Sequence, residues 1–188
     1  EHRHLSHLYC VWPLFETQNN DDLAKACNQA IFNRESENEA SHALVHRSLI
    51  AARLKDSDSL TDALLNLMNH KIRYDSLMTN HDYDQGSCYC TDFAIGYLGI
   101  INEALVYSNT GEIELLPALI DGFDKGEITG INARTRATVD SLSWDMSTGK
   151  VEAKITSQID QESSVSYGEE TQKLVFKVGE TKTVSFSK

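Results

Sequence analysis

The run Gly111-Glu112-Ile113-Glu114-Leu115-Leu116 marks the point where the hydrophobic pattern of this 188-residue chain changes. From Gly111 onward, apolar and polar residues alternate, and a period of two is typical of half-buried strands. Before Gly111, apolar residues recur at helical spacing. The sequence therefore predicts an α+β protein, with a helical part over residues 1–110 and an antiparallel β-sheet or sandwich over residues 111–188.

The helical part contains four stretches with an apolar face. They begin near Asn20, Asn38, Ser59 and Asp92, and we expect helices over about 20–31, 38–54, 59–68 and 92–107. Ser59 and Asp62 have capping-box spacing at the third start. Residues 74–91 are polar and irregular, and a loop of this length is often functional. Chemistry in the first part is therefore expected near this loop.

The second part predicts about six or seven short strands. Alternating runs occur at 112–115, 127–131, 136–139, 150–155, 173–178 and 183–186. Glycine-containing turn signals separate two pairs of them, at Thr148-Gly149 and Val178-Gly179. Trp144 lies in one strand-like segment, where a tryptophan belongs to the core more often than to a surface.

Charge limits the classes of partner. With 17 basic and 28 acidic residues the net charge is -11, whereas nucleic acids and anionic membranes require a basic face. No apolar run approaches the roughly 18 residues of a membrane span. The sequence thus predicts no nucleic-acid or membrane partner, and a neutral ligand fits it best.

The four cysteines do not form a metal or redox motif. Cys88 and Cys90 are separated by one residue, so a disulfide between them would be strained, and the spacing is not CxxC. We expect free or buried thiols. One disulfide involving Cys10 and Cys27 is the alternative if the protein is exported.

The chain begins with an unusual concentration of polar chemistry. Three histidines and an arginine lie among the first nine residues, whereas termini are normally frayed and chemically dull. We therefore expect the chain to be one end of something larger, beginning just upstream of a working segment. The spacing of His2, His4 and His7 matches no common zinc motif, so no metal is expected.

Four ordered segments resemble one family. They are HRHLSHLY at residues 2–9, IAARLKD at 50–56, Asp92 with the downstream Gly96 and Glu103, and EIELLPAL at 112–119 followed by GINAR at 130–134. They resemble the HRHxSHLY, WARLGD, QIDGNFG…IAEML and GEIxLLPALP…GLRARG segments of glycoside hydrolase family 95, the inverting α-L-fucosidases. The resemblance covers about residues 1–157.

The resemblance implies an architecture and a setting. Family members place the active site in an (α/α)6 barrel and follow it with a C-terminal β-domain, so this chain would hold the terminal barrel helices and that β-domain. An incomplete barrel exposes apolar helix faces, so the expected partners are a missing N-terminal part of the same protein or a second copy, besides a fucosylated or related glycan. The implied location of the parent is secreted or periplasmic, and no cofactor is implied.

The resemblance also implies site residues. An inverting glycosidase needs an acid and a base; in the family these are an upstream Glu and an Asn polarised by an Asp, and Asp92 lies at the position of that Asp. Arg3 and His4 lie where the family contacts the sugar, and His81 corresponds to a family histidine in its HPPF segment. The alternatives are that Asp92 only caps its helix, with Thr91 as a competitor, and that Arg3 and His4 form a hydrogen-bonded structural cluster.

Several residues depart from the family pattern. Phe93-Ala94 replaces Gly-Asn, Ser41-His42-Ala43 replaces Gly-Trp-Ser, and Cys10 replaces Gly. We expect a divergent member with altered specificity or lost activity, and an isolated chain that is inactive because the acid and the Asn are not in it. His42, His46 and His70 are expected to be solvated or core-edge residues. Two alternatives stay open: a non-catalytic carbohydrate-binding or structural remnant, in which Trp12 or Trp144 stacks on a sugar, and α-L-galactosidase specificity in the parent.

Overall fold

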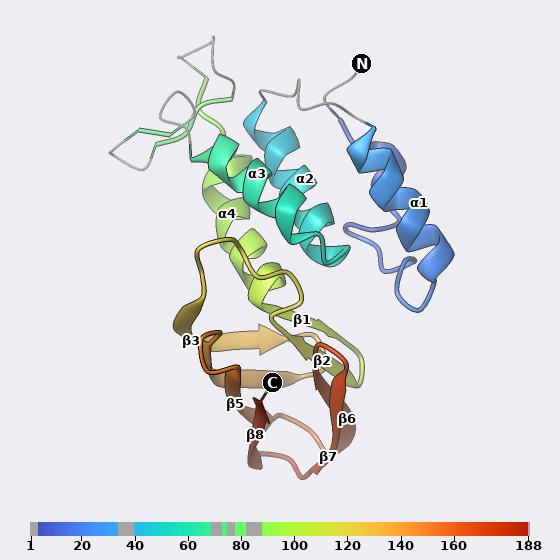
Figure 1. Ribbon diagram of the computed structural model, residues 1–188, viewed down its shortest axis with the longest axis vertical. Coiled ribbons are helices and arrows are strands. Elements are labelled where there is room, and N and C mark those ends of the chain that lie inside the picture. The colour runs from blue at the N-terminus through green and yellow to red at the C-terminus, as the bar shows by residue number, and fades with distance from the viewer. Residues whose placement is uncertain (1–3, 34–39, 69–72, 75–77, 82–87, 188) are drawn as a thin grey trace. The chain divides into compact units, whose positions relative to one another are not determined.

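The computed structural model describes residues 4–33, 40–68, 73–74, 78–81 and 88–187 (Figure 1). The chain divides into two compact units, Glu1–Ala104 and Leu105–Lys188. Helices precede strands along the chain, which confirms the α+β class predicted from the hydrophobic pattern. None of the described helices is both long and apolar enough to cross a membrane.

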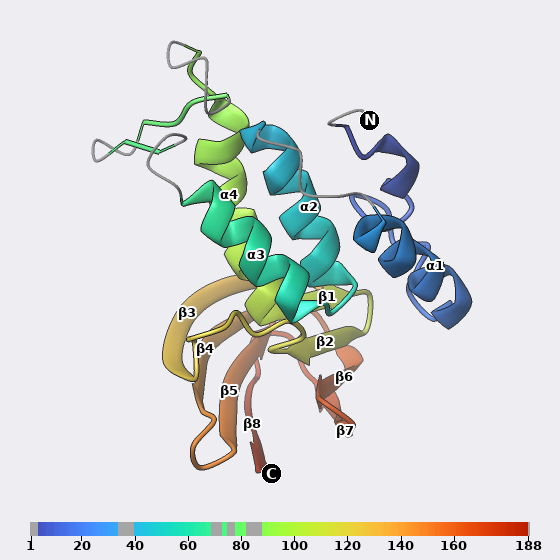
Figure 2. The same ribbon diagram turned by 45° about the horizontal axis from the view of Figure 1, so that its top comes forward.

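The described residues of the first unit form a short 3-10 helix, η1 (Ser6–Leu8), and four α-helices. These are α1 (Asp21–Phe32), α2 (Ser41–Arg53), α3 (Ser57–Leu67) and α4 (Thr91–Leu105). Helix α2 is buried on most of its surface, and Figure 2 shows it between α3 and α4 on one side and α1 on the other. Helix α2 is therefore buried on several faces, whereas α1 and α3 are amphipathic and each bury one face.

Two expected helix ends differ from the structure. Helix α3 begins earlier than predicted, because Asp56 is its N-cap and its side chain accepts a hydrogen bond from the Ser59 N–H at 3.0 Å. Helix α4 stops at Leu105 instead of Tyr107, because the next residues form a strand in which Val106 pairs with Leu115. Pairing with a distant strand outweighs the continuation of the local helical pattern.

Helix α4 approaches α2 closely at Gly96. A Cβ atom at this position would lie only 2.5 Å from Cγ1 of Val45, well inside van der Waals contact. One turn further along, the Gly99 position faces Leu49 at an ordinary 3.9 Å. Glycine at 96 therefore sets the distance between the two helices.

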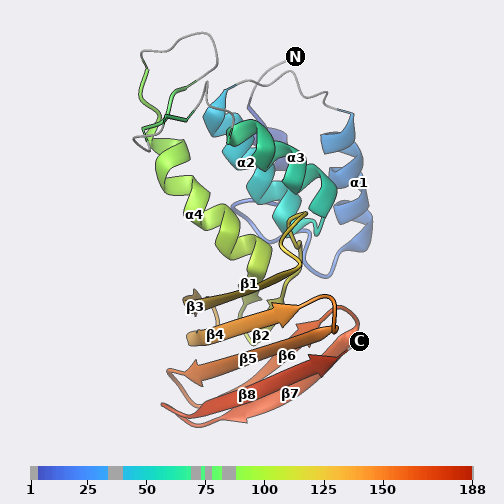
Figure 3. The same cartoon turned by 60° about the vertical axis from the view of Figure 1, so that its left-hand side comes forward.

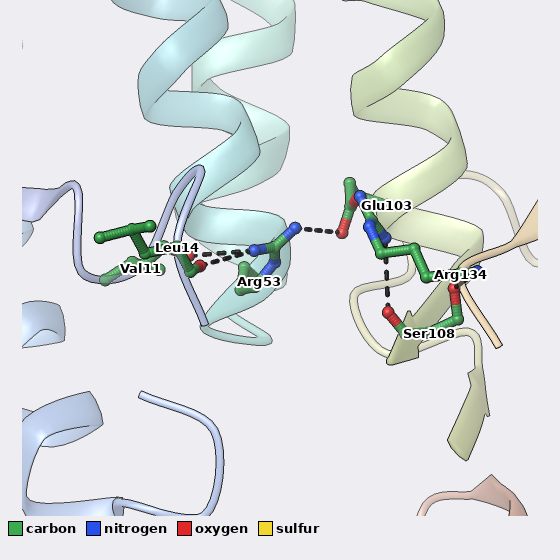
Figure 4. A network of polar contacts seen from close by, with 6 residues as sticks. All are labelled: Val11, Leu14, Arg53, Glu103, Ser108 and Arg134. Atoms are coloured by element: carbon green, nitrogen blue, oxygen red, sulfur yellow. Dashed lines mark hydrogen bonds and ion pairs between the residues drawn. The ribbon is translucent and has the colours of Figure 1, made fainter. Parts of the chain in front are cut away.

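Arg53, the last residue of α2, joins three segments of the first unit (Figure 4). Its Nη1 donates to the carbonyls of Val11 and Leu14 at 3.1 and 2.9 Å, and its Nη2 forms an ion pair with Glu103 of α4 at 3.1 Å. The side chains of Arg53 and Glu103 are 0% and 5% exposed. A buried charge is tolerated only when it is paired and hydrogen-bonded, so each partner depends on the other.

Two aromatic rings enclose the same guanidinium group. The Arg53 Cζ lies 4.4 Å from the ring centroid of Trp12 and 4.2 Å from that of Phe15, within the range of cation–π attraction. Trp12 thus packs the loop that follows η1. Through these contacts, the loop 11–15 is held against α2.

The second unit is a sandwich of two four-stranded sheets (Figure 3). The first has the order β1 (Val106–Asn109), β2 (Glu112–Leu115), β6 (Gln161–Tyr167), β7 (Glu170–Phe176). The second has the order β3 (Lys125–Ala133), β4 (Ala137–Asp145), β5 (Lys150–Ser157), β8 (Thr181–Ser187). Inward-facing residues alternate along β4 and β5, as in Val151, Ala153 and Ile155, and form the core between the sheets.

The sandwich corrects two expectations. Eight strands are present because β1 and the serine-rich β6 also pair, and neither has a clear alternating pattern. The sheets are not wholly antiparallel, because β2 and β6 run parallel. The chain leaves the first sheet after β2, builds β3 to β5 in the second sheet, and returns in the same direction as β2.

Trp144 on β4 is a core residue, as predicted. It is 6% exposed, and its indole N–H donates to the carbonyl of Phe123 at 2.6 Å. On the neighbouring strand, Gly126 pairs with it, and a Cβ at that glycine would come within 2.5 Å of the ring. Because the indole is enclosed, Trp144 offers no open ring face on which a sugar could stack.

Strand β1 is tied to the turn after β3 by Ser108 and Arg134 (Figure 4). The Arg134 backbone N–H donates to Ser108 Oγ at 2.9 Å, and the Arg134 guanidinium donates to the Ser108 carbonyl at 3.5 Å. Arg134 belongs to the GINAR segment, and this contact gives it a local role in joining the two sheets.

We predict that Glu103→Gln lowers the free energy of unfolding of the first unit by about 3 kcal/mol, because it removes the carboxylate charge that pairs with the buried Arg53 guanidinium. Urea unfolding followed by helical circular dichroism reports on this unit, since all described α-helices except the last residue of α4 lie in it. Glu16→Gln, which removes the same charge from an exposed position, is the matched control and should leave the midpoint unchanged. Equal stability of both variants would contradict the prediction.

Candidate active site

Three histidines from distant parts of the sequence come together in the first unit. His42 Nε2 lies 3.2 Å from His4 Nδ1, and the ring centroids of these residues are 4.9 Å apart. The ring centroid of His81 is 5.3 Å from that of His42. The three imidazoles thus form a row with His42 in the middle, which we call the histidine row.

The backbone fixes the position of each member of the row. His42 is the second residue of α2, and His4 lies two residues before η1. The carbonyl of His81 accepts a 2.6 Å hydrogen bond from the Ser41 N–H, one of the amides at the start of α2 that have no partner within the helix. This bond brings the loop that carries His81 to the N-terminus of α2.

The described ends of the 74–91 loop form a short antiparallel ladder, where the sequence predicted irregular structure. Asn80 and Tyr89 are bridged; the His81 N–H donates to the Cys88 carbonyl at 2.9 Å, and the Cys90 N–H donates to the Thr79 carbonyl at 3.0 Å. One side of this ladder carries His81, and the other leads directly into α4. The loop is therefore a connection between the histidine row and the start of α4.

Asp92 is exposed in the first turn of α4. Its carboxylate accepts a long contact from the Cys90 thiol at 3.9 Å. Asp92 is the second residue of the helix, which begins at Thr91. An acidic side chain in the first turn is favourable because it lies near the positive end of the helix dipole.

A hollow of about 310 Å³ lies along the first turns of α4. Its lining is mostly apolar, with the side chain of Arg73 as the one cation among the described residues that line it. Phe93 and Ala94, the residues that depart from the family's Gly-Asn, both contribute to the wall. The departures therefore change the surface next to Asp92, whereas Gly96 one turn later keeps its packing role.

Of the four site residues taken from the resemblance, His4 and His81 lie in one row and Asp92 lies at the end of the ladder that begins at His81. Arg3 lies outside the described residues, as do His2 and His70. His42 was expected to be a solvated or core-edge residue, and the structure makes it the link between the other two histidines. Its position in the Ser41-His42-Ala43 segment, which differs from the family pattern, was the available signal.

The bond within the row limits its protonation. One ring nitrogen of the His4–His42 contact must donate and the other must accept, so the two rings cannot both carry a proton on the facing nitrogens. The described residues contain no group of three or more His, Cys, Asp or Glu side chains arranged to hold a metal ion. Each imidazole of the row can hydrogen-bond to a hydroxyl group, since the ring can donate or accept.

His46 lies one turn after His42 on α2 and is partly buried. Its Nε2 lies 3.1 Å from the Trp12 carbonyl and its ring contacts Tyr9 edge-on at 5.3 Å. Burial lowers the pKa of His46 below 6.5, and positive charge on His4 or His7 acts in the same direction, whereas the Trp12 carbonyl opposes the shift. The ring donates its Nε2–H to this carbonyl, which can only accept, and so contacts the loop after η1.

We predict that the stability of the chain decreases as the pH falls from 6.5 toward the lowered pKa of His46. In this window the unfolded chain binds a proton that the folded chain resists, so protonation favours unfolding. His46→Gln should make the decline shallower, because glutamine has no such proton to bind. The unfolding midpoint between pH 5 and 8, together with NMR titration of the His46 ring, measures both effects; a His46 pKa at or above 6.5 would contradict the prediction.

Comparison with known proteins agrees with the resemblance seen in the sequence. Residues 1–105 match the family described as "Glycosyl hydrolase family 95 catalytic domain", and residues 107–188 match "Glycoside hydrolase family 95, C-terminal domain". The chain is also 26% identical over 151 residues to "Alpha-L-fucosidase 2" of Arabidopsis thaliana. That match covers 76% of this chain and 18% of the plant protein. The chain belongs to glycoside hydrolase family 95.

Proposed function

We propose that this chain contributes the C-terminal side of the active site of an inverting glycosidase that removes terminal α-linked L-fucose from glycans. The observation that carries the proposal is the histidine row, which gathers His4 and His81 around His42 and connects them by a backbone ladder to the helix that begins near Asp92. The family and the name of the plant relative support the substrate class. Helices α1 to α4 would then be part of an (α/α)6 barrel.

Each residue has a proposed role. The Asp92 carboxylate would accept a hydrogen bond from the side-chain amide of an Asn outside this chain, and this polarises the amide oxygen as an acceptor for a proton from water. The activated water attacks the anomeric carbon from the face opposite the leaving group, which a Glu outside this chain protonates. Arg3 and the histidine row would hold the hydroxyl groups of the sugar.

Exposed apolar residues support the need for the rest of the domain. Ile95 and Leu98 on α4 are 75% and 67% exposed, and Leu65 on α3 and Phe32 on α1 are also open to solvent. Side chains of this kind on several helices mark surfaces that other elements cover. We propose that the remaining barrel helices of the parent cover them, and that the isolated chain has no hydrolase activity because it lacks the acid and the Asn.

We predict that Asp92→Asn in the protein encoded by the whole reading frame lowers kcat for an aryl α-L-fucoside by about 100-fold or more, since the amide of the variant cannot polarise the Asn base. Proton NMR of the first product detects the anomer, and inversion gives the β-anomer of L-fucose. Asp58→Asn is the matched control, because Asp58 is an exposed acid in the first turn of α3. It should leave kcat unchanged.

Three results would contradict this function. They are full activity of Asp92→Asn, an α-anomer as the first product, and turnover by the isolated 188-residue chain. Release of L-galactose in preference to L-fucose would keep the mechanism and change the substrate to an α-L-galactoside. Replacement of His42 by alanine should raise KM if the row binds the sugar, whereas a loss of folding in that variant would be visible by circular dichroism.

A further inference from the structure

We propose that Cys10 and Cys27 form a disulfide when the surrounding thiol–disulfide couple is oxidising. This bond would link the segment that follows His4 and η1 to helix α1. The two Sγ atoms already lie 3.7 Å apart with both thiols reduced. A disulfide requires about 2.05 Å, so the sulfurs need to close the remaining gap by side-chain rotation. The proposal does not rest on the glycosidase function.

The backbone on both sides of the pair is fixed. Cys10 follows η1, and its carbonyl accepts a hydrogen bond from the Glu16 N–H at 2.9 Å. Cys27 lies in the interior of α1. The two residues therefore meet because the loop and the helix are each held in place, and no rearrangement of either backbone is needed to keep the sulfurs in contact.

The surroundings of the pair are apolar. Both cysteines pack with one hydrophobic cluster that contains Leu5, Leu8, Val11, Ile31 and Ile50. Burial, with the adjacent Cys10 thiol, raises the pKa of Cys27 to about 11. Cys10 is half-buried and Cys27 is buried, so an external oxidant reaches Cys10 first.

The reaction is an exchange with a small-molecule disulfide such as oxidised glutathione. The Cys10 thiolate attacks one sulfur of the oxidant, forms a mixed disulfide and releases one glutathione thiolate. The Cys27 thiol then loses its proton to solvent and attacks the Cys10 sulfur, which releases the second glutathione. Two protein thiols are oxidised, one glutathione disulfide is reduced to two thiols, and the protein loses two hydrogen atoms.

The other two cysteines serve as internal controls. Cys88 and Cys90 lie on one strand of the short ladder with Tyr89 between them. Cys88 is exposed and Cys90 is buried. In an extended strand, residues two apart have Cα atoms about 6.7 Å from each other, close to the upper limit for a disulfide, so a bond between Cys88 and Cys90 would be strained. We therefore expect no disulfide between Cys88 and Cys90 under the conditions that join Cys10 to Cys27.

The test uses the whole 188-residue chain equilibrated with oxidised or reduced glutathione, alkylated under native conditions and again after unfolding, and digested with trypsin. Cleavage after Arg3, Lys25 and Arg34 places Cys10 in the peptide 4–25 and Cys27 in the peptide 26–34, whereas Cys88 and Cys90 share a separate peptide. Mass spectrometry is expected to find the first two peptides joined at the oxidising poise and separate at the reducing poise. Closing this loop should also raise the Tm by about 5 °C or more.

Two variants make the result specific. Cys10→Ser and Cys27→Ala should each abolish the joined peptides and the redox dependence of Tm, whereas Cys88→Ser should keep both. Alkylation of both Cys10 and Cys27 at the oxidising poise would overturn the proposal, and so would a joined product that involves Cys88 or Cys90 instead. A lower Tm in the oxidised chain would show a strained bond and overturn its role as a tether.

Discussion

The buried ion pair between Arg53 and Glu103 is the constraint on which the first unit depends. A guanidinium with no exposed surface needs partners in place of water, and here two loop carbonyls, one carboxylate and two aromatic rings surround it. Removal of water strengthens these contacts and makes each of them costly to lose. The segment that carries His4 is therefore held by a charge located at the far end of α2 from His42.

The histidine row shows how backbone hydrogen bonds assemble a site. His81 reaches the start of α2 because its own carbonyl satisfies the Ser41 N–H, and the ladder that positions His81 continues into the helix of Asp92. The side chains are thus placed by main-chain groups that any residue could supply. A side chain of the row can therefore change without loss of the scaffold, and His42 is the member at which the sequence departs from the family pattern.

The residues that match the family segments and those that differ from them have different structural roles. Arg53, Glu103 and Gly96 match the family segments, and each determines packing: two form the buried ion pair and the third admits the close approach of α4 to α2. Phe93 and Ala94 differ from the family and line the hollow along α4, and His42 differs from it in the middle of the histidine row. The matching residues thus set the packing of α2 and α4, whereas these three departures lie at the starts of the same two helices.

Periodicity alone determined the α+β class, the four helices, most of the strands and the core position of Trp144, because each depends on local alternation of apolar and polar residues. Ordered motifs determined the family and pointed to His4, His81 and Asp92. The tertiary structure decided what depends on distant partners. Val106 joins a strand because Leu115 pairs with it, Asp56 caps α3 although Ser59 could also do so, and β6 pairs although its serines hide the pattern. His42 lies in the middle of the row only because three separate segments come together at one helix end. A local sequence pattern cannot predict such a contact between distant segments.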